Sequence, residues 1–242
     1  MRRRDFLLAL GLTLLLPGSA LAAIAHDATG SFGASPTTTS PMEWLHNPVG
    51  TPRGIIVLIA TNDTTDTVTG VTYDGVAMTL VRRQNVGGEN GSAYGYFLGA
   101  SIPATDPATI SVTFTGVNNH MGTSASVTAA DDTSVEHHLG LSNVSLDDPS
   151  ITLTTSVTTM TYGALYSGLA GPTSTDNDAN HTTIQETDLG AETSSCIHRN
   201  APVAAGSPVV GWVNTGADDV AAVALAVREG VPAVTRRVLV IP

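Results

Sequence analysis

Seven histidines, one cysteine and scattered carboxylates are the residues of this sequence whose types could support catalysis. His137 and His138 are adjacent, so on a strand they point to opposite faces, and no two histidines have the H-x-x-x-H spacing of a metal site. No G-x-S-x-G nucleophile motif occurs. Cys196 is expected to be a small buried side chain. The sequence therefore predicts no enzyme and no required cofactor, although a carboxylate pair from distant strands stays open as a glycosidase site.

One acidic stretch has the spacing of a calcium loop. In "DNDAN", Asp176, Asp178 and Asn180 stand where the first three ligands of such a loop would stand. His181 replaces the glycine that the loop needs for its sharp turn, and Thr187 occupies the position of the last acidic ligand. A Ca²⁺ site is therefore one hypothesis, and a solvated loop is the alternative.

Aromatic residues make up only 5% of the chain, which limits where a sugar ring could stack. Trp44, Trp212, Tyr94 and Tyr96 are the candidates for a glycan-binding surface. Tyr94 and Tyr96 share one face of a strand, and the same alternation makes them equally suitable core residues. Glycan binding at these four residues is therefore a hypothesis with a structural alternative.

The elements that must position these residues are strands. Asp74-Gly75 in "VTGVTYDGVAMTLV" is a strong signal for a two-residue hairpin turn. The register of that hairpin places Val71, Tyr73, Met78 and Leu80 on one apolar face. "GIIVLIAT" (54–61) is a continuous apolar run, as expected for a strand buried on both faces. The run at 219–229, between two aspartates and Gly230, is also interpreted as a strand.

Turn signals recur along the chain and separate roughly 11 to 12 strand candidates. No strand–helix–strand unit is evident, so we expect an all-β protein, a two-sheet antiparallel β-sandwich with a jelly-roll-like topology. The predicted organisation has four parts: a signal peptide (1–22), a polar lead-in with one possible edge strand (23–41), a single sandwich domain (42–230) and a C-terminal tail or edge strand (231–242).

Charge narrows the possible partners. The chain has a formal net charge of −11 and lacks lysine, so its surface would repel a phosphate backbone and nucleic acid is not an expected partner. The start "MRRRDFLLALGLTLLLPGSALA" has the basic region, apolar run and A-x-A pattern of a secretory signal, with cleavage expected after Ala22. "RRDFL" also resembles a twin-arginine core, and an ordinary secretory signal is the alternative. Export to the periplasm, the cell surface or the exterior follows, with no membrane span after cleavage.

The segments "TPRGIIVLI", "VTGVTYDGVAMTLV", "AYGYFLGASIP", "ATISVTFTG" and "DDVAAVALAV" together resemble the β-sandwich domains of phage virion proteins and of related bacterial surface proteins. The resemblance covers about residues 42–229 and lies in hairpins and core strands. It implies a structural or adhesive module that is assembled into a larger particle or fibre, and it supplies no catalytic residues. The signal-like N-terminus departs from virion proteins, which need no export.

These observations lead to one main hypothesis and two alternatives. The main hypothesis is a secreted, non-enzymatic structural, adhesive or assembly module that contacts itself or other surface proteins. The first alternative is a glycan-binding or glycan-active jelly roll, for which Ca²⁺ near Asp176 and Asp178 is an option. The second is a phage-derived virion structural protein.

Overall fold

The structure of the chain is a computed structural model, and it describes residues 23–32, 37–63, 67–86, 91–116, 119–168, 175–176, 180–189, 192–213 and 216–230. These described residues form 17 strands and no helix, so the predicted all-β sandwich is confirmed. The four-part division into 1–22, 23–41, 42–230 and 231–242 is only partly visible, because residues 1–22 and 231–242 lie outside the described residues.

The predicted hairpin forms where its turn residues require it. Strands β4 (Val68–Tyr73) and β5 (Val76–Ala77) pair around Asp74 and Gly75, with Tyr73 opposite Val76. Asp74 and Gly75 have φ angles of 47° and 80°, the left-handed region that a tight hairpin turn of this type requires. Tyr73 and Met78 are buried as expected. Leu80 is 45% exposed, because the chain after β5 leaves this sheet and joins another.

Four antiparallel sheets form, rather than the two that the sequence predicted. The first five-stranded sheet has the order β1 (Ala25–Ser31), β9 (His120–Thr128), β3 (Gly54–Thr61), β7 (Ser92–Leu98) and β6 (Thr79–Asn85). The second has the order β10 (Ala130–Leu146), β17 (Asp218–Glu229), β12 (Thr159–Ser167), β15 (Thr193–Arg199) and β14 (His181–Asp188). A small sheet has the order β2 (Met42–His46), β8 (Ala108–Phe114), β4 and β5, and another has β11 (Ser150–Thr152), β16 (Val209–Val213) and β13 (Thr175–Asp176).

The two halves of the chain repeat one topology. The order β1-β9-β3-β7-β6 in the first half matches the order β10-β17-β12-β15-β14 in the second, strand for strand along the sequence. The small sheets match in the same way, since β2-β8-β4 corresponds to β11-β16-β13. Only the short β5 has no counterpart among the described strands. The chain passes from one repeat to the next between β9 and β10 at Ala129, whose φ angle is 53°.

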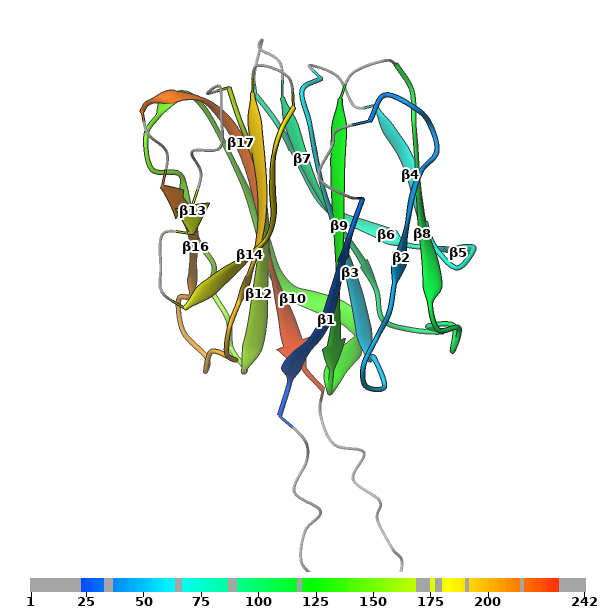
Figure 1. Cartoon of the computed structure of the whole chain (residues 1–242). Coiled ribbons are helices and arrows are strands. Elements are labelled where there is room, and N and C mark those ends of the chain that lie inside the picture. The colour runs from blue at the N-terminus through cyan, green and yellow to red at the C-terminus, as the bar shows by residue number, and fades with distance from the viewer. Residues whose placement is uncertain are drawn as a thin grey trace, which may run out of the picture.

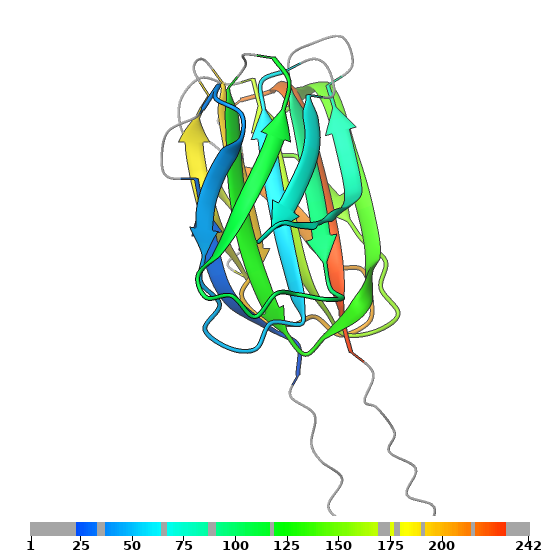
Figure 2. The same cartoon turned by 90° about the vertical axis from the view of Figure 1, so that its right-hand side faces the viewer.

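The four sheets stack as layers, with the two five-stranded sheets in the middle (Figure 1). Figure 2 shows the same stack from the side of the small sheet that contains β2, β4 and β8. Alternate side chains of β3 belong to two different hydrophobic cores. Ile56 and Leu58 face the second repeat, whereas Ile55 and Val57 face the small sheet that contains β2. In β17, Val223 and Leu225 face the first repeat, while alternate residues pack with Trp212 in a third core. Both central sheets are therefore covered on both faces, which explains their continuous apolar runs.

The region predicted as a polar lead-in belongs to the sandwich. Strand β1 pairs with β9 along the edge of the first five-stranded sheet, with a bulge between His26 and Ala28. Ile24 is fully buried in the core between the two repeats. The sandwich therefore begins well before residue 42.

Candidate functional site

The four aromatic residues predicted to bind glycans lie inside the protein. Trp212 and Tyr94 are fully buried, and Tyr96 and Trp44 are only 5% and 7% exposed. Trp44 Nε1 donates a hydrogen bond to Ser124 Oγ at 3.0 Å, which satisfies its one polar atom within the core. Burial contradicts the hypothesis that these rings form an exposed platform. Their alternation with small residues was the pattern of core packing instead.

The predicted calcium ligands lie partly outside the described residues. Asp178 is not described, and Asp176 is described only through the backbone pairing of β13, where it stands opposite Trp212. The backbone carbonyl of Asn180 accepts a hydrogen bond from Asn200 N at 2.6 Å. Within the described part of the chain, no three His, Cys, Asp or Glu residues are grouped as a metal site. The calcium site at this loop stays a prediction.

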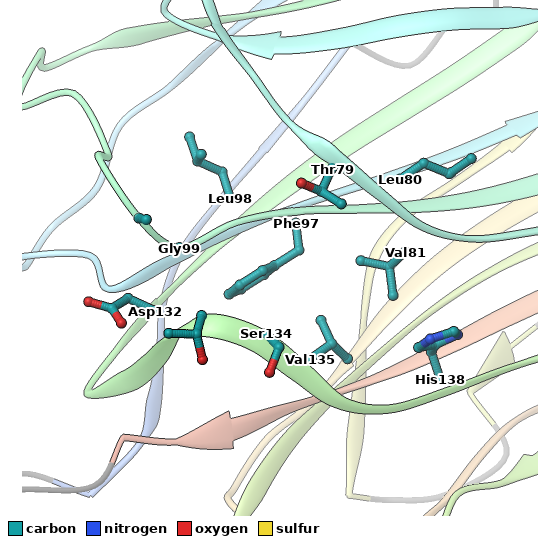
Figure 3. A pocket seen from close by; sticks show the side chains of 12 residues that line it. Thr79, Leu80, Val81, Phe97, Leu98, Gly99, Asp132, Ser134, Val135 and His138 are labelled. Atoms are coloured by element: carbon teal, nitrogen blue, oxygen red, sulfur yellow. The ribbon is translucent and has the colours of Figure 1, made fainter.

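A cleft of about 370 Å³ opens where the two repeats meet, between strands β6 and β7 on one side and β10 on the other (Figure 3). Leu80, Val81, Phe97 and Val135 form its apolar part. Thr79, Asp132, Thr133, Ser134 and His138 supply its polar groups. We call this site the bulge cleft, because it lies where β10 bulges away from β17.

The bulge is formed by residues 130–135, with the sequence "ADDTSV". Ala130 pairs with Glu229 and Val135 with Val227, so four residues of β10 stand opposite one residue of β17. Asp131 Oδ1 accepts hydrogen bonds from the Thr133 backbone N at 2.8 Å and from Thr133 Oγ1 at 2.5 Å. This local turn competes with the sheet ladder and moves the strand outward. The same hydrogen bonds lower the pKa of the Asp131 carboxyl.

Ion pairs with Arg228 of β17 hold the displaced strand at both ends of the bulge. Arg228 Nε lies 3.4 Å from Asp131 Oδ2, and Arg228 Nη1 lies 3.6 Å from Glu136 Oε2. Glu136 Oε1 also accepts hydrogen bonds from Ser156 N and Ser156 Oγ, which lower the pKa of its carboxyl. The Arg228 pairs are partly buried and form a network, so they hold geometry better than one exposed pair would.

A glycine directly after β7 lets the chain approach the bulge closely. A Cβ atom at Gly99 would lie 2.5 Å from the backbone oxygen of Asp132, a contact that no side chain could make without moving β10. On the outer rim of the cleft, Arg53 Nη2 pairs with Asp132 Oδ2 at 3.0 Å, and both side chains are half exposed. The cleft therefore has a fixed backbone on one side and a solvated charge pair at its mouth.

The aromatic ring of Phe97 projects from β7 toward β10, where Ser134 and Val135 lie opposite it (Figure 3). Phe97 is 6% exposed and belongs to the core between the repeats, so the bottom of the cleft is continuous with that core. An apolar group that enters here would extend the central core and not merely rest on the surface. The site is suited to holding an apolar side chain or ring.

At the other end of the bulge cleft, His138 carries a polar atom without a partner. His138 Nδ1 is buried and has no hydrogen bond among the described residues. Burial, with help from the nearby Arg82 and His137 charges, lowers the pKa of the His138 imidazole. A neutral imidazole can donate or accept one hydrogen bond, so His138 could fix the orientation of a polar group beside the apolar part.

Beyond the cleft, polar contacts close the seam between β6 and β10. Gln84 Nε2 donates to Ser142 Oγ at 3.0 Å, and Arg82 Nη2 donates to Gln84 Oε1 at 3.4 Å. Gly140 makes room for them, since a Cβ atom there would lie 2.5 Å from Gln84 Oε1. The seam is thus sealed along one part and open at the bulge.

A second polar cluster lies along strand β1, away from the bulge cleft. The rings of His26 and His198 stack with centroids 3.8 Å apart, and His26 Nδ1 lies 3.2 Å from the Tyr162 hydroxyl. On the other face of the sheet, His46 Nδ1 lies 2.9 Å from Ser124 Oγ. Burial is the main cause that lowers the pKa of both His26 and His46 to about 4.

Asp27 stands at the bulge of β1 and accepts bonds from Ser126 Oγ at 2.8 Å and from Gly50 N at 2.7 Å. These bonds tie the loop before β3 to the sheet. The histidines and Asp27 therefore stabilise packing around β1. A Ser–His–Asp relay needs the carboxylate to bind the imidazole that contacts the serine. His46 contacts Ser124 through Nδ1, and its Nε2 has no hydrogen-bond partner among the described residues, so the geometry is not that of a relay.

Sequence reasoning missed the bulge cleft because its residues come from two consecutive strands, β6 and β7, and from β10, which is distant from them in the chain. Asp131-Asp132 were expected to form a turn, and the Asp131–Thr133 hydrogen bonds confirm a local turn there. This turn, which lies inside a long strand, was the one feature of the sequence that could have indicated the bulge. Cys196 is fully buried, as expected, and burial raises the pKa of its thiol to about 12.

No protein-family model matches the chain, and no curated protein or solved structure matches it significantly. The part of the chain that the structure describes contains no helix long and apolar enough to cross a bilayer.

Proposed function

We propose that this protein is exported and acts outside the cytoplasm as a structural module with an adhesive or assembly role. The N-terminal pattern of residues 1–22 supports export. The resemblance of the hairpin and core segments to virion and bacterial surface domains supports a structural role, and a phage-derived virion protein is the alternative origin. The partners would be other copies of the chain or other surface proteins.

One observation carries the proposal: both ends of the described chain leave the sandwich at the same end (Figure 1). Ile24 N donates a hydrogen bond to Glu229 Oε1 at 3.2 Å, and Gly230 N donates to Ala129 O at 2.8 Å. A module attached through either terminus would therefore stand on that end. Its opposite end would then face away from the attachment point, and the two outer small sheets would form its sides (Figure 1). Such a placement leaves these surfaces available to a partner, as a displayed adhesive or assembly domain requires.

The outer face of the small sheet β2-β8-β4-β5 fits such a role. Thr69 and Thr113 are exposed there, and Thr69 Oγ1 donates a hydrogen bond to Thr113 Oγ1 at 3.1 Å. Ser111 and Thr72 stand opposite each other on the same face. Beside the exposed Glu43 and Leu45 of β2, these short uncharged hydroxyl side chains give part of the face a hydrated surface with little side-chain entropy to lose on contact.

The test is expression of the full chain in a bacterial host, followed by cell fractionation and intact-mass measurement. The expected result is a protein outside the cytoplasm whose mass lacks residues 1–22. In the matched control, Ala22→Arg, the small residue that the cleavage site needs is lost and the uncleaved precursor should accumulate. Full-length protein confined to the cytoplasm would contradict export.

The structural role needs a separate measurement on the processed protein. Light scattering should detect assemblies larger than one chain, or beads coated with the protein should adhere to cells more than uncoated beads do. A strictly monomeric protein that also fails to promote adhesion would contradict the proposed role while leaving export intact.

A further inference from the structure

One arginine beside the bulge cleft carries a charge that no carboxylate of the described chain neutralises. Arg82 of β6 directly follows the cleft residue Val81, and its Nη2 donates a hydrogen bond to Gln84 Oε1 at 3.4 Å. Arg82 Nε is buried and has no hydrogen-bond partner among the described residues. Arg53 and Arg228 form ion pairs with carboxylates, whereas Arg82 forms none within the part of the chain that the structure describes. Its positive charge is therefore available to an anion.

The register of β6 turns Arg82 toward the second repeat. Arg82 stands opposite Gly95, where a Cβ atom would meet Leu225 of β17, so both positions face the core between the repeats. Gly140 of β10 lies against the guanidinium, since a Cβ atom there would be 2.9 Å from Arg82 Nε. The charge therefore lies in the seam between β6 and β10. His138 lies at this end of the bulge cleft, whereas Asp132 lies at the opposite end (Figure 3).

His138 adds a second unsatisfied nitrogen at the same end of the cleft. Its Nδ1 is buried and has no hydrogen-bond partner among the described residues. Burial lowers the pKa of the His138 imidazole, and the nearby Arg82 charge lowers it further. A neutral imidazole can donate one hydrogen bond. Because buried polar atoms normally have partners, two unsatisfied nitrogens beside one cleft favour an acceptor with negative charge as the group that binds there.

The rest of the cleft is complementary to an apolar group. Leu80, Val81 and Val135 line it, and the ring of Phe97 connects it to the core between the repeats. Leu80 is 45% exposed, so an apolar ligand would also remove this side chain from water. An aromatic ligand could pack against the Phe97 ring in an edge-to-face arrangement. A volume of about 370 Å³ lies in the range of small-molecule pockets and is enough for one ring with a short chain.

We propose that the bulge cleft binds a small carboxylic acid whose apolar part is an aromatic ring or a branched chain. The carboxylate accepts hydrogen bonds from the Arg82 guanidinium and the His138 imidazole, while the apolar part packs against Phe97 and Val135. A planar guanidinium matches the geometry of a carboxylate. The net charge of −11 disfavours anions over the surface as a whole, so recognition depends on this one arginine. The inference goes beyond the proposed structural role and does not depend on it.

Titration of the processed protein with three probes, followed by nuclear magnetic resonance shifts, tests the proposal. The probes are 3-phenylpropionate, the neutral 3-phenyl-1-propanol, and acetate, which keeps the carboxylate without the ring. We expect 3-phenylpropionate to bind with a dissociation constant on the order of 1 mM or tighter. It should bind about tenfold more tightly than either of the other probes. Nuclear Overhauser contacts from the probe ring to Phe97 and Val135 should place it in the cleft.

Three variants separate the contributions of the charge and of the apolar lining. Arg82→Gln should weaken binding of 3-phenylpropionate about tenfold and leave binding of the alcohol unchanged. The matched control is Arg83→Gln at the next position, which stands opposite Tyr94 and faces away from the second repeat, and it should bind like the parent. Leu80→Ser should weaken the acid and the alcohol by the same factor. Circular dichroism should show the parent fold in all three.

Equal affinities for the acid and the alcohol in the parent protein would overturn the proposal, because the guanidinium would then contribute nothing. Contacts from the probe ring to residues outside the cleft would also overturn it, as would the absence of any shift at millimolar 3-phenylpropionate. Equal losses in Arg82→Gln and Arg83→Gln would do the same. Light scattering and adhesion test the structural role separately, so none of these results bears on that role.

Discussion

His46 should make the protein sensitive to mild acid. Its side chain is fully buried between the first five-stranded sheet and the small sheet that contains β2. Nδ1 contacts Ser124 Oγ, and Nε2 has no hydrogen-bond partner among the described residues. Burial lowers the pKa of the imidazole from 6.5 to about 4, the nearby Asp27 carboxylate opposing this only in part. The folded protein therefore holds this residue neutral.

The sign and size of the effect follow from linkage. In the unfolded chain His46 takes up a proton near pH 6.5, whereas the folded protein resists protonation until about pH 4. The contribution of His46 to the free energy of unfolding is therefore fully present above pH 6.5 and is lost progressively as the pH falls from 6.5 to 4. A difference of roughly 2.5 pKa units corresponds to about 3 kcal/mol, a large fraction of the stability of a typical domain.

The assay is urea unfolding of the parent chain and of His46→Gln at pH 7 and pH 4. Glutamine can still hydrogen bond to Ser124 and has no titrating group, so the loss of stability between the two pH values should shrink by about 3 kcal/mol. The control Ser124→Ala removes the hydrogen-bond partner and keeps the buried imidazole. It should lower stability at pH 7 while preserving the steep dependence on pH. An identical pH dependence in the parent and His46→Gln would refute the reasoning.

Three further changes test the packing. Asp131→Ala removes the acceptor that holds the β10 bulge and should lower the free energy of unfolding by about 1–3 kcal/mol in urea titrations; an unchanged midpoint would mean that the bulge forms without it. Gly163→Ala places a Cβ 2.7 Å from Trp212 Cη2 and should cost about 1–3 kcal/mol, whereas Gly216→Ala meets nothing within 4 Å and should be close to neutral; equal effects would argue against this core. Cys196 should resist thiol reagents in the native protein and react fully in urea, and rapid native labelling would show that it is not buried.

The local structure of the strands could be predicted from the sequence because it depends on neighbouring residues. Asp74-Gly75 set the hairpin, and the strand predicted over 219–229 appears as β17. The continuous apolar run at 54–61 correctly indicated a strand buried on both faces. The sheet that covers each face of a strand is determined by contacts between residues far apart in the sequence. The stack of four sheets could therefore not be predicted from local patterns.

Polar residues in the core explain another part of what the sequence concealed. Thr123, Ser124 and Ser126 of β9 look like surface residues, yet all three are buried beneath β1 and the neighbouring sheets. Ser124 and Ser126 satisfy their hydroxyls with His46 and Asp27, partners that lie on other strands. Pattern alone cannot assign such residues to a core, because the hydrogen bonds that permit their burial are tertiary.

The bulge cleft was beyond prediction for the same reason. Its floor and rim join β6, β7 and β10, and its shape depends on one strand leaving its ladder at residues 131–134. The four aromatic residues do not form an exposed platform, because alternating tyrosines and isolated tryptophans serve equally well as core residues. Here both tryptophans fill the spaces between the central and the small sheets.

The packing of one repeat against the other is the claim on which the cleft, the buried histidines and the shared chain ends all depend. Its most direct test is nuclear Overhauser spectroscopy with labelled leucine methyl groups. Gly95 of β7 leaves just enough room for Leu225 of β17, since a Cβ atom at Gly95 would lie 2.5 Å from Leu225 Cδ1. Strong cross-peaks between the Leu225 methyls and the Gly95 α-protons are predicted. Leu225 methyls that show cross-peaks only to residues of the second repeat would contradict the account.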